Sequence, residues 1–93
     1  MAKGYIIYNK KSKYYYTKFD NFDEFNIYVK IFPTKEEAEK YIPVAIRNQI
    51  FELLELIYNK SRLEIDITQE EYDNIKEHID LEVKGLYMAT GDA

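Results

Sequence analysis

The sequence predicts a small α+β fold in which an antiparallel sheet packs against two to three helices. Two runs rich in aromatic and β-branched residues, Tyr5–Tyr8 and Tyr14–Phe19, flank the polar stretch Asn9–Lys13, a pattern typical of a β-hairpin. Two Thr-x-x-Glu sequences precede apolar residues at helical spacing and indicate helix starts. With 93 residues, 46% of them hydrophobic, the chain is expected to form one domain over residues 1–93.

A third strand is expected at Ile27–Phe32, where β-branched and aromatic residues dominate again. The preceding stretch Asp20–Asn26 is polar, and we expect a loop that turns the rings of Phe22 and Phe25 inward. The hairpin and this third strand together form the predicted sheet.

The first helix is expected to begin after Thr34, because Thr34 and Glu37 fit the capping box that satisfies backbone donors at a helix start. Pro43 cannot donate the helical hydrogen bond, so a break or kink is predicted there. The segment Val44–Lys60 is strongly helical. Its apolar stripe consists of Ile46, Ile50, Leu53, Leu54 and Ile57.

The C-terminal half contributes a second capped helix and one or two further strands. Leu63–Ile67 alternates apolar and polar residues, like a strand with one buried face. Thr68 opens the next helix with another capping box, and this helix extends to about Ile79. Leu81–Met88 is ambiguous between a short final strand and an ordered tail, since Gly85 weakens a strand.

Charge is distributed unevenly along the chain. Residues 1–18 carry five lysines and no acid, residues 64–93 carry nine acids and two lysines, and the formal net charge is −4. A dipolar chain of this kind can orient on a charged partner. We therefore expect two electrically different faces, at least one of which contacts a partner. Two ordinary solvated ends are the alternative.

The hairpin tip is the first candidate partner-binding site. Its lysines, Lys10, Lys11 and Lys13, precede three tyrosines, of which Tyr15 points to the opposite side of the strand from its neighbours. Rings flanked by lysines occur in single-strand nucleic-acid binders, and the same composition favours protein interfaces. We favour a protein partner because the chain is acidic overall. A hairpin stabilised by cross-strand tyrosines, with lysines for solubility, is the remaining interpretation.

The acidic segment supplies the second candidate partner-binding site, on the helix that follows Thr68. Closely spaced carboxylates imitate a phosphate backbone and can occupy a nucleic-acid-binding groove of another protein. The residues are Glu70, Glu71, Asp73 and Glu77. A solvated helix face is the alternative, with the first two acids well placed at a helix N-terminus.

The long helix has more apolar surface than one sheet face requires. Phe51, Leu54 and Tyr58 follow the i, i+3, i+7 spacing of a helix that packs against a partner. A homodimer through this helix is one hypothesis. A central helix enclosed between the sheet and the last helix is the other.

The sequence lacks the patterns that catalysis and cofactor binding require. The chain has no cysteine, and its single histidine, His78, has no second histidine or cysteine with which to share zinc. Neither a glycine-rich phosphate loop nor a nucleophile elbow occurs. We therefore predict no enzyme activity, no catalytic residues, no metal and no cofactor. Without a signal peptide or an apolar spanning run, we expect a cytoplasmic location in a host cell and no membrane partner.

The stretch Gly4–Ile42, a hairpin of aromatic strands followed by a strand end and a capped helix, is similar to modules of small phage and prophage proteins. Part of it resembles the end of the RNA–DNA-hybrid-binding domain of some ribonucleases H. The matching residues are Phe32, Thr34, Glu36, Glu37 and Ala38. The glycine-rich, tryptophan-bearing turn of that domain is missing, so hybrid binding is not assigned to these residues. As a short, cysteine-free, acidic chain, it also resembles phage-encoded inhibitors of host machinery, including anti-CRISPR proteins.

This resemblance implies a small, non-enzymatic, phage-encoded binding protein. Its expected partner is a host nucleic-acid-processing or defence protein, which it inhibits. The alternatives are a nucleic-acid-binding module that uses the basic hairpin and a structural homodimer through the helix at residues 44–60.

Overall fold

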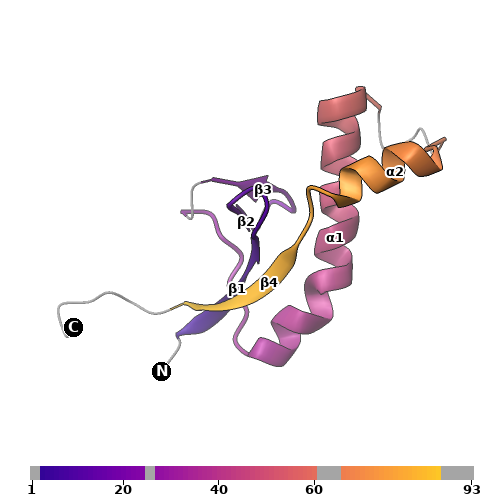
Figure 1. Cartoon of the computed structure of the whole chain (residues 1–93). Coiled ribbons are helices and arrows are strands. Elements are labelled where there is room, and N and C mark those ends of the chain that lie inside the picture. Colours follow the sequence, from indigo (N-terminus) through magenta and orange to yellow (C-terminus); the bar gives the residue numbers. More distant parts are fainter. Residues whose placement is uncertain (1–2, 25–26, 61–65, 87–93) are drawn as a thin grey trace.

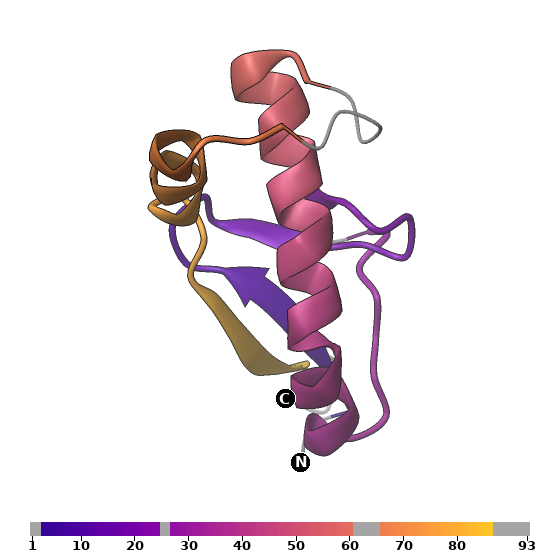
Figure 2. The ribbon, with the colours of Figure 1, turned by 90° about the vertical axis from the view of Figure 1, so that its right-hand side faces the viewer.

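The computed structural model of the chain describes residues 3–24, 27–60 and 66–86. It has a four-stranded antiparallel sheet with the strand order β3-β2-β1-β4, and two helices. The elements are β1 (Gly4–Asn9), β2 (Tyr14–Tyr16), β3 (Phe22–Asp23), α1 (Lys35–Tyr58), α2 (Gln69–Lys76) and β4 (Leu81–Leu86). Helix α1 lies across one face of the sheet (Figure 2), and α2 lies beside the C-terminal half of α1 (Figure 1). The predicted α+β fold is confirmed.

The N-terminal hairpin is confirmed, with a shorter second strand than expected. Lys13 closes the turn in a left-handed backbone conformation (φ 67°), and its N–H donates to the backbone oxygen of Asn9 at 2.8 Å. The second strand does not fill Tyr14–Phe19, because the N–H of Thr17 already donates to the backbone oxygen of Asn21 in the next turn.

The expected continuous strand at Ile27–Phe32 is wrong. Only Val29 and Phe32 form isolated bridges, to Thr17 and Tyr5 respectively. The segment therefore lies first beside the end of β2 and then beside the start of β1. A segment that changes its neighbour in this way cannot form a regular ladder with either strand.

The expected loop at Asp20–Asn26 contains β3 instead, which pairs antiparallel with β2. The ring of Phe22 is buried, as predicted, and packs against Tyr16 with 5.1 Å between the ring centres. Phe25, the other ring expected to point inward, lies outside the described residues.

Helix α1 is continuous over 24 residues, so the predicted break at Pro43 is wrong. The helix bends in its N-terminal half (Figure 1) and continues through the proline. A proline removes only one intrahelical hydrogen bond, and the packing of α1 against the sheet offsets that loss. Thr34 caps the helix as predicted, because its hydroxyl accepts a hydrogen bond from the N–H of Glu37 at 3.2 Å.

The core lies between α1 and the sheet, and the helix contributes small residues to it. Ala38 and Ala45 are fully buried, which lets the helix backbone approach the strands closely. Of the predicted apolar stripe only Leu54 is buried, and Ile57 is 43% exposed. The stripe is therefore not the face that contacts the sheet. The buried cluster consists of Ile7, Tyr16, Phe22, Phe32, Ala38 and Ala45.

The C-terminal half adds one strand and one helix. The ambiguous segment forms β4, which pairs with β1 over six residue pairs. Thr68 starts α2 with the complete capping box that was predicted, but the helix ends at Lys76 rather than near Ile79. The strand expected at Leu63–Ile67 falls mostly outside the described residues, and its last two residues, which are described, are not in a strand.

Candidate protein-binding surface

The pairing of β1 with β4 places the basic start of the chain beside its acidic end. The N–H of Lys10 donates to the backbone oxygen of Asp80 at 2.8 Å, and the Lys10 ammonium lies 3.5 Å from the Asp80 carboxylate. The hairpin tip and the exit of α2 are therefore neighbours (Figure 1). The expected separation into two electrically different faces is partly lost, because opposite charges pair at this junction.

Asn9 holds this junction together, although the sequence pattern indicated only a place in the turn. Its buried side chain donates to the backbone oxygen of His78 at 2.9 Å. Its Oδ1 accepts from the N–H of Lys11 at 3.0 Å and from the N–H of Asp80 at 3.1 Å. No local pattern could reveal this role, since two of the three partners lie 69 and 71 residues away.

The predicted basic site divides between exposed lysines and a packed tyrosine. Lys10 is paired with Asp80, while Lys11 and Lys13 are exposed. Tyr15 is half-buried, because its ring packs against Tyr8 with 5.0 Å between the ring centres. The ring of Tyr15 is thus partly occupied within the molecule.

Strand alternation places Tyr15 on the outer face of the sheet, the face away from α1. Its neighbour Tyr16 is buried under α1, so Tyr15 points the other way, as predicted. The ammonium of Lys84 lies 4.4 Å from the ring centre of Tyr8, which completes a row of three side chains on this face. The described residues place no helix over it (Figure 2).

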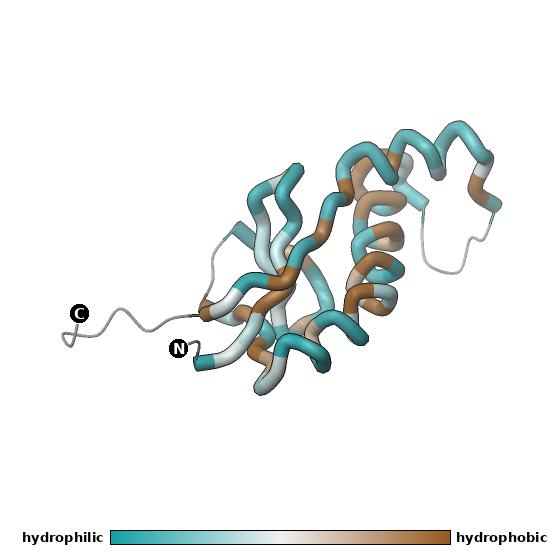
Figure 3. The backbone as a smooth tube through the Cα atoms, turned by 60° about the horizontal axis from the view of Figure 1, so that its bottom comes forward, coloured by the Kyte–Doolittle hydropathy of each residue, from teal (hydrophilic) through white to brown (hydrophobic). Residues whose placement is uncertain are grey.

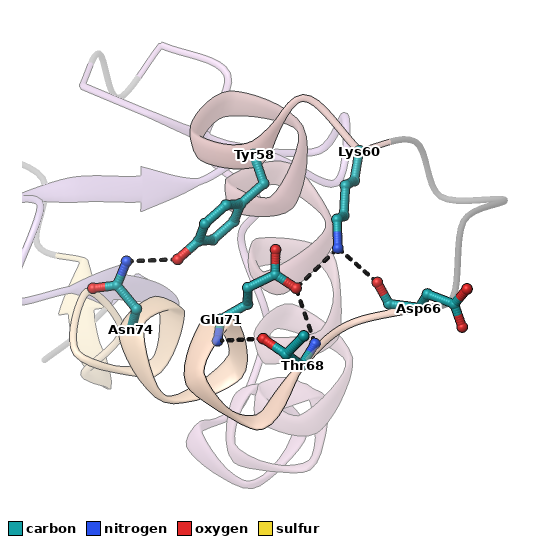
Figure 4. Close-up of polar contacts among 6 residues, drawn as sticks. All are labelled: Tyr58, Lys60, Asp66, Thr68, Glu71 and Asn74. Atoms are coloured by element: carbon teal, nitrogen blue, oxygen red, sulfur yellow. Dashed lines mark hydrogen bonds and ion pairs between the residues drawn. The ribbon is translucent and has the colours of Figure 1, made fainter.

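The predicted acidic site contains one residue that supports the fold. Glu71 accepts hydrogen bonds from the N–H of Thr68 and from the ammonium of Lys60, both at 2.9 Å (Figure 4). These two hydrogen bonds lower the pKa of Glu71, the one from the Thr68 backbone most. Lys60 also donates to the backbone oxygen of Asp66 at 2.7 Å, so this ion pair holds the approach to α2 against the end of α1.

The other three predicted acids lie together. Glu70, Asp73 and Glu77 line a surface hollow with Tyr58 of α1 and Asn74 of α2. The Asn74 side chain donates to the Tyr58 hydroxyl at 2.8 Å across the two helices (Figure 4). Since α2 is largely hydrophilic (Figure 3), the hollow is an acidic, polar surface.

The three residues predicted for a helix-mediated dimer do not share one free face. Leu54 is buried within the chain, and Tyr58 accepts the hydrogen bond from Asn74. Phe51 is half-buried and lines a different hollow. A homodimer through α1 stays a prediction, and two of its three expected contact residues already pack within the molecule.

A patch of exposed apolar side chains was not foreseen. We call it the Phe19 patch: Lys18, Phe19, Ile27 and Tyr28. Phe19, Ile27 and Tyr28 are 62%, 74% and 48% exposed. The rings of Phe19 and Tyr28 meet edge to face, 5.4 Å apart, and the Lys18 ammonium lies 5.6 Å from each ring centre. The expected strand at residues 27–32 did not indicate this patch, because one of Ile27 and Tyr28 would point toward the core if both lay in a regular strand.

A hollow beside the patch combines rings with carboxylates. It is lined by Phe19, Asp20, Asn21, Phe51, Glu52 and Glu55. Glu52 accepts a hydrogen bond from the N–H of Phe22 at 3.2 Å, and partial burial raises the pKa of its carboxyl group. Such a hollow suits a lysine or arginine side chain flanked by apolar groups.

No protein-family model matches the chain, and neither a curated protein nor a solved structure is significantly similar to it. In the described part of the chain, no group of three histidine, cysteine or acidic residues could hold a metal ion. Neither helix of that part is both long and apolar enough to cross a bilayer.

Proposed function

We infer that the chain is a small binding protein that engages another protein through the Phe19 patch and the hollow beside it. The main support for this proposal is the exposure of three large apolar side chains, Phe19, Ile27 and Tyr28, in one part of the surface. Clusters of this kind on a small protein mark interaction sites, and aromatic residues are enriched in protein interfaces. The contact between the two rings, with Lys18 beside both, orders them before a partner binds and so reduces the entropy lost on binding.

The charge beside the patch supports a partner with a basic surface. Carboxylates of Asp20, Glu52 and Glu55 lie in the adjacent hollow, and a second acidic hollow lies on α2. Proteins that process nucleic acids present basic grooves to phosphate backbones. The proposed partner is accordingly a nucleic-acid-processing or defence protein of a host cell. The chain inhibits it by covering its basic surface, and the compositional resemblance to phage-encoded inhibitors supports a phage origin.

The test is affinity capture from host lysate, followed by assay of the purified captured protein on nucleic acid. The double substitution Phe19→Ser with Tyr28→Ser removes the ring pair and is expected to weaken binding about tenfold or more. Leu56→Ser is the matched control, because Leu56 is 72% exposed on α1 outside the patch. Wild type and the control are expected to bind and inhibit the partner equally.

Three results would contradict the proposal: equal binding by the double variant, no inhibition, or a captured partner without any role on nucleic acid or in defence. Salt-sensitive binding of the chain itself to single-stranded nucleic acid, lost on Lys11→Glu with Lys13→Glu, would favour the nucleic-acid alternative instead.

A further inference from the structure

The outer edge of β4 carries backbone hydrogen-bonding groups that no described strand uses. β4 lies at the end of the sheet (Figure 1), and among the described residues its only strand neighbour is β1. Six residues form this edge, from Leu81 to Leu86. An unpaired edge of this length is a template for another strand.

The direction of these groups follows from hydrogen bonds along β1. Tyr5 exchanges both backbone hydrogen bonds with Phe32 at 2.8 Å on the side away from β4, whereas Lys10, just beyond β1, donates to Asp80 on the β4 side. Successive strand residues direct these groups to alternate sides, so the even-numbered residues of β1 bond to β4. In β4 the groups that point out of the sheet therefore belong to Leu81, Val83 and Gly85.

We propose that two copies of the chain pair antiparallel through their β4 edges, with Val83 of one copy opposite Val83 of the other. In this register the outward-pointing groups of Val83 hydrogen-bond to each other across the two-fold axis. Leu81 pairs with Gly85 of the second copy, where no side chain opposes it. The result is a continuous eight-stranded sheet with both copies of α1 on the same face.

The charges of Glu82 and Lys84 favour this alignment of the two β4 strands. With Val83 on the axis, Glu82 of each copy lies opposite Lys84 of the other, which creates two cross-strand pairs of opposite charge. A shift of the axis by one residue places Glu82 opposite Glu82, or Lys84 opposite Lys84. In the first of these registers Asp80 would also face Lys84, but Asp80 lies beyond β4 and already pairs with Lys10. Opposite charges directly across a strand pair are stabilising and like charges are destabilising. This interface lies on β4 and does not involve the Phe19 patch.

The test is the mass of the full-length chain in solution by analytical ultracentrifugation over a concentration series. Wild type is expected to approach twice the chain mass of 11.2 kDa. Glu82→Lys alone places two ammonium groups opposite each other at both pairs, and Lys84→Glu alone does the same with carboxylates. Each is expected to raise the dissociation constant about tenfold or more. An equimolar mixture of the two variants restores opposite charges at both pairs and is expected to dimerise again.

Two controls separate this interface from other causes. Lys40→Glu makes the same charge change at an exposed position of α1, and Phe51→Glu disrupts the dimer predicted through α1. Both are expected to remain dimeric. The proposal is overturned if wild type is monomeric, if each single charge variant dimerises like wild type, if the mixture stays monomeric, or if Phe51→Glu abolishes the dimer. Circular dichroism verifies that every variant is folded.

Discussion

The side-chain amide of Asn9 donates a hydrogen bond to the backbone oxygen of His78, and this contact joins the hairpin turn to the exit of α2. The same side chain accepts hydrogen bonds from two backbone N–H groups, so one buried residue satisfies three backbone groups. Buried polar groups left without partners are costly.

Asn9→Ala is accordingly expected to lower the free energy of unfolding by about 2–4 kcal/mol. Urea denaturation followed by circular dichroism measures this. Ser12→Ala is the matched control, because the Ser12 hydroxyl accepts one exposed hydrogen bond from the N–H of Tyr14 at 3.2 Å. Its loss is expected to cost less than about 1 kcal/mol. Equal effects of the two substitutions would contradict the role given to Asn9.

A side chain at position 4 is expected to destabilise the fold while Ile31 is present. A Cβ atom on Gly4 would lie 3.2 Å from the backbone oxygen of Phe32 and in direct collision with Cγ2 of Ile31. Gly4→Ala should lower the free energy of unfolding by about 1–3 kcal/mol through overpacking. Adding Ile31→Ala removes the closest atom and should restore most of the loss. A double variant as unstable as the single one would show that Ile31 is not the cause.

Tyr16 links stability to alkaline pH. Burial raises the pKa of its phenol, which donates to Asp20 at 2.9 Å and accepts from the Asn48 amide at 2.7 Å. The unfolded chain ionises this group above about pH 10 while the folded chain does not, so stability falls as pH rises through that range. Tyr16→Phe should be less stable than wild type at pH 7 by about 1–3 kcal/mol, because Asn48 loses its acceptor. The difference in the free energy of unfolding between wild type and the variant should become smaller above about pH 10. A difference in the free energy of unfolding that does not change with pH would contradict the link between Tyr16 ionisation and stability.

Glu52 is expected to be a destabilising charge at neutral pH. Its pKa is raised by partial burial, so ionisation of the folded chain above the ordinary carboxyl range costs stability. Glu52→Gln keeps an acceptor for the N–H of Phe22 and removes that charge. The variant should melt at a higher temperature than wild type at pH 7 and at nearly the same temperature at pH 4. Equal melting temperatures at both pH values would show that the carboxylate carries no penalty.

Glu71 is expected to act in the opposite direction. Its pKa is lowered by hydrogen bonds from Thr68 and Lys60, so the stability it contributes is present above the ordinary carboxyl range and lost as pH falls. Lys60→Met should therefore reduce stability more at pH 7 than at pH 2, where the hydrogen bond to the Asp66 backbone is lost but the ion pair with Glu71 is already absent, as measured by thermal melting. Lys35→Met is the control, because the exposed Lys35–Glu39 pair is 3.9 Å apart and should contribute almost nothing. A similar loss for both variants would contradict the special role of Lys60.

Short sequence patterns predicted the elements that are determined by residues close together in the chain. The aromatic runs around a polar turn predicted the β1–β2 hairpin, and the hydroxyls of Thr34 and Thr68 predicted both helix starts. Strand alternation also separated Tyr15 from Tyr16 correctly. The causes of these features lie within a few residues of one another, so a short window contains all the information needed.

The remaining features depend on which segments meet in space. Segment 27–32 has the composition of a strand but lies beside β2 at one end and beside β1 at the other. Pro43 lies inside a continuous helix, because α1 packs against the sheet. The partners of Asn9, the pairing of β4 with β1 and the exposure of Phe19 all join residues distant in sequence or depend on what covers them. Composition therefore predicted an α+β fold and an uneven distribution of charge, whereas long-range packing selected which rings and charges are exposed, because burial depends on contacts that no local pattern encodes.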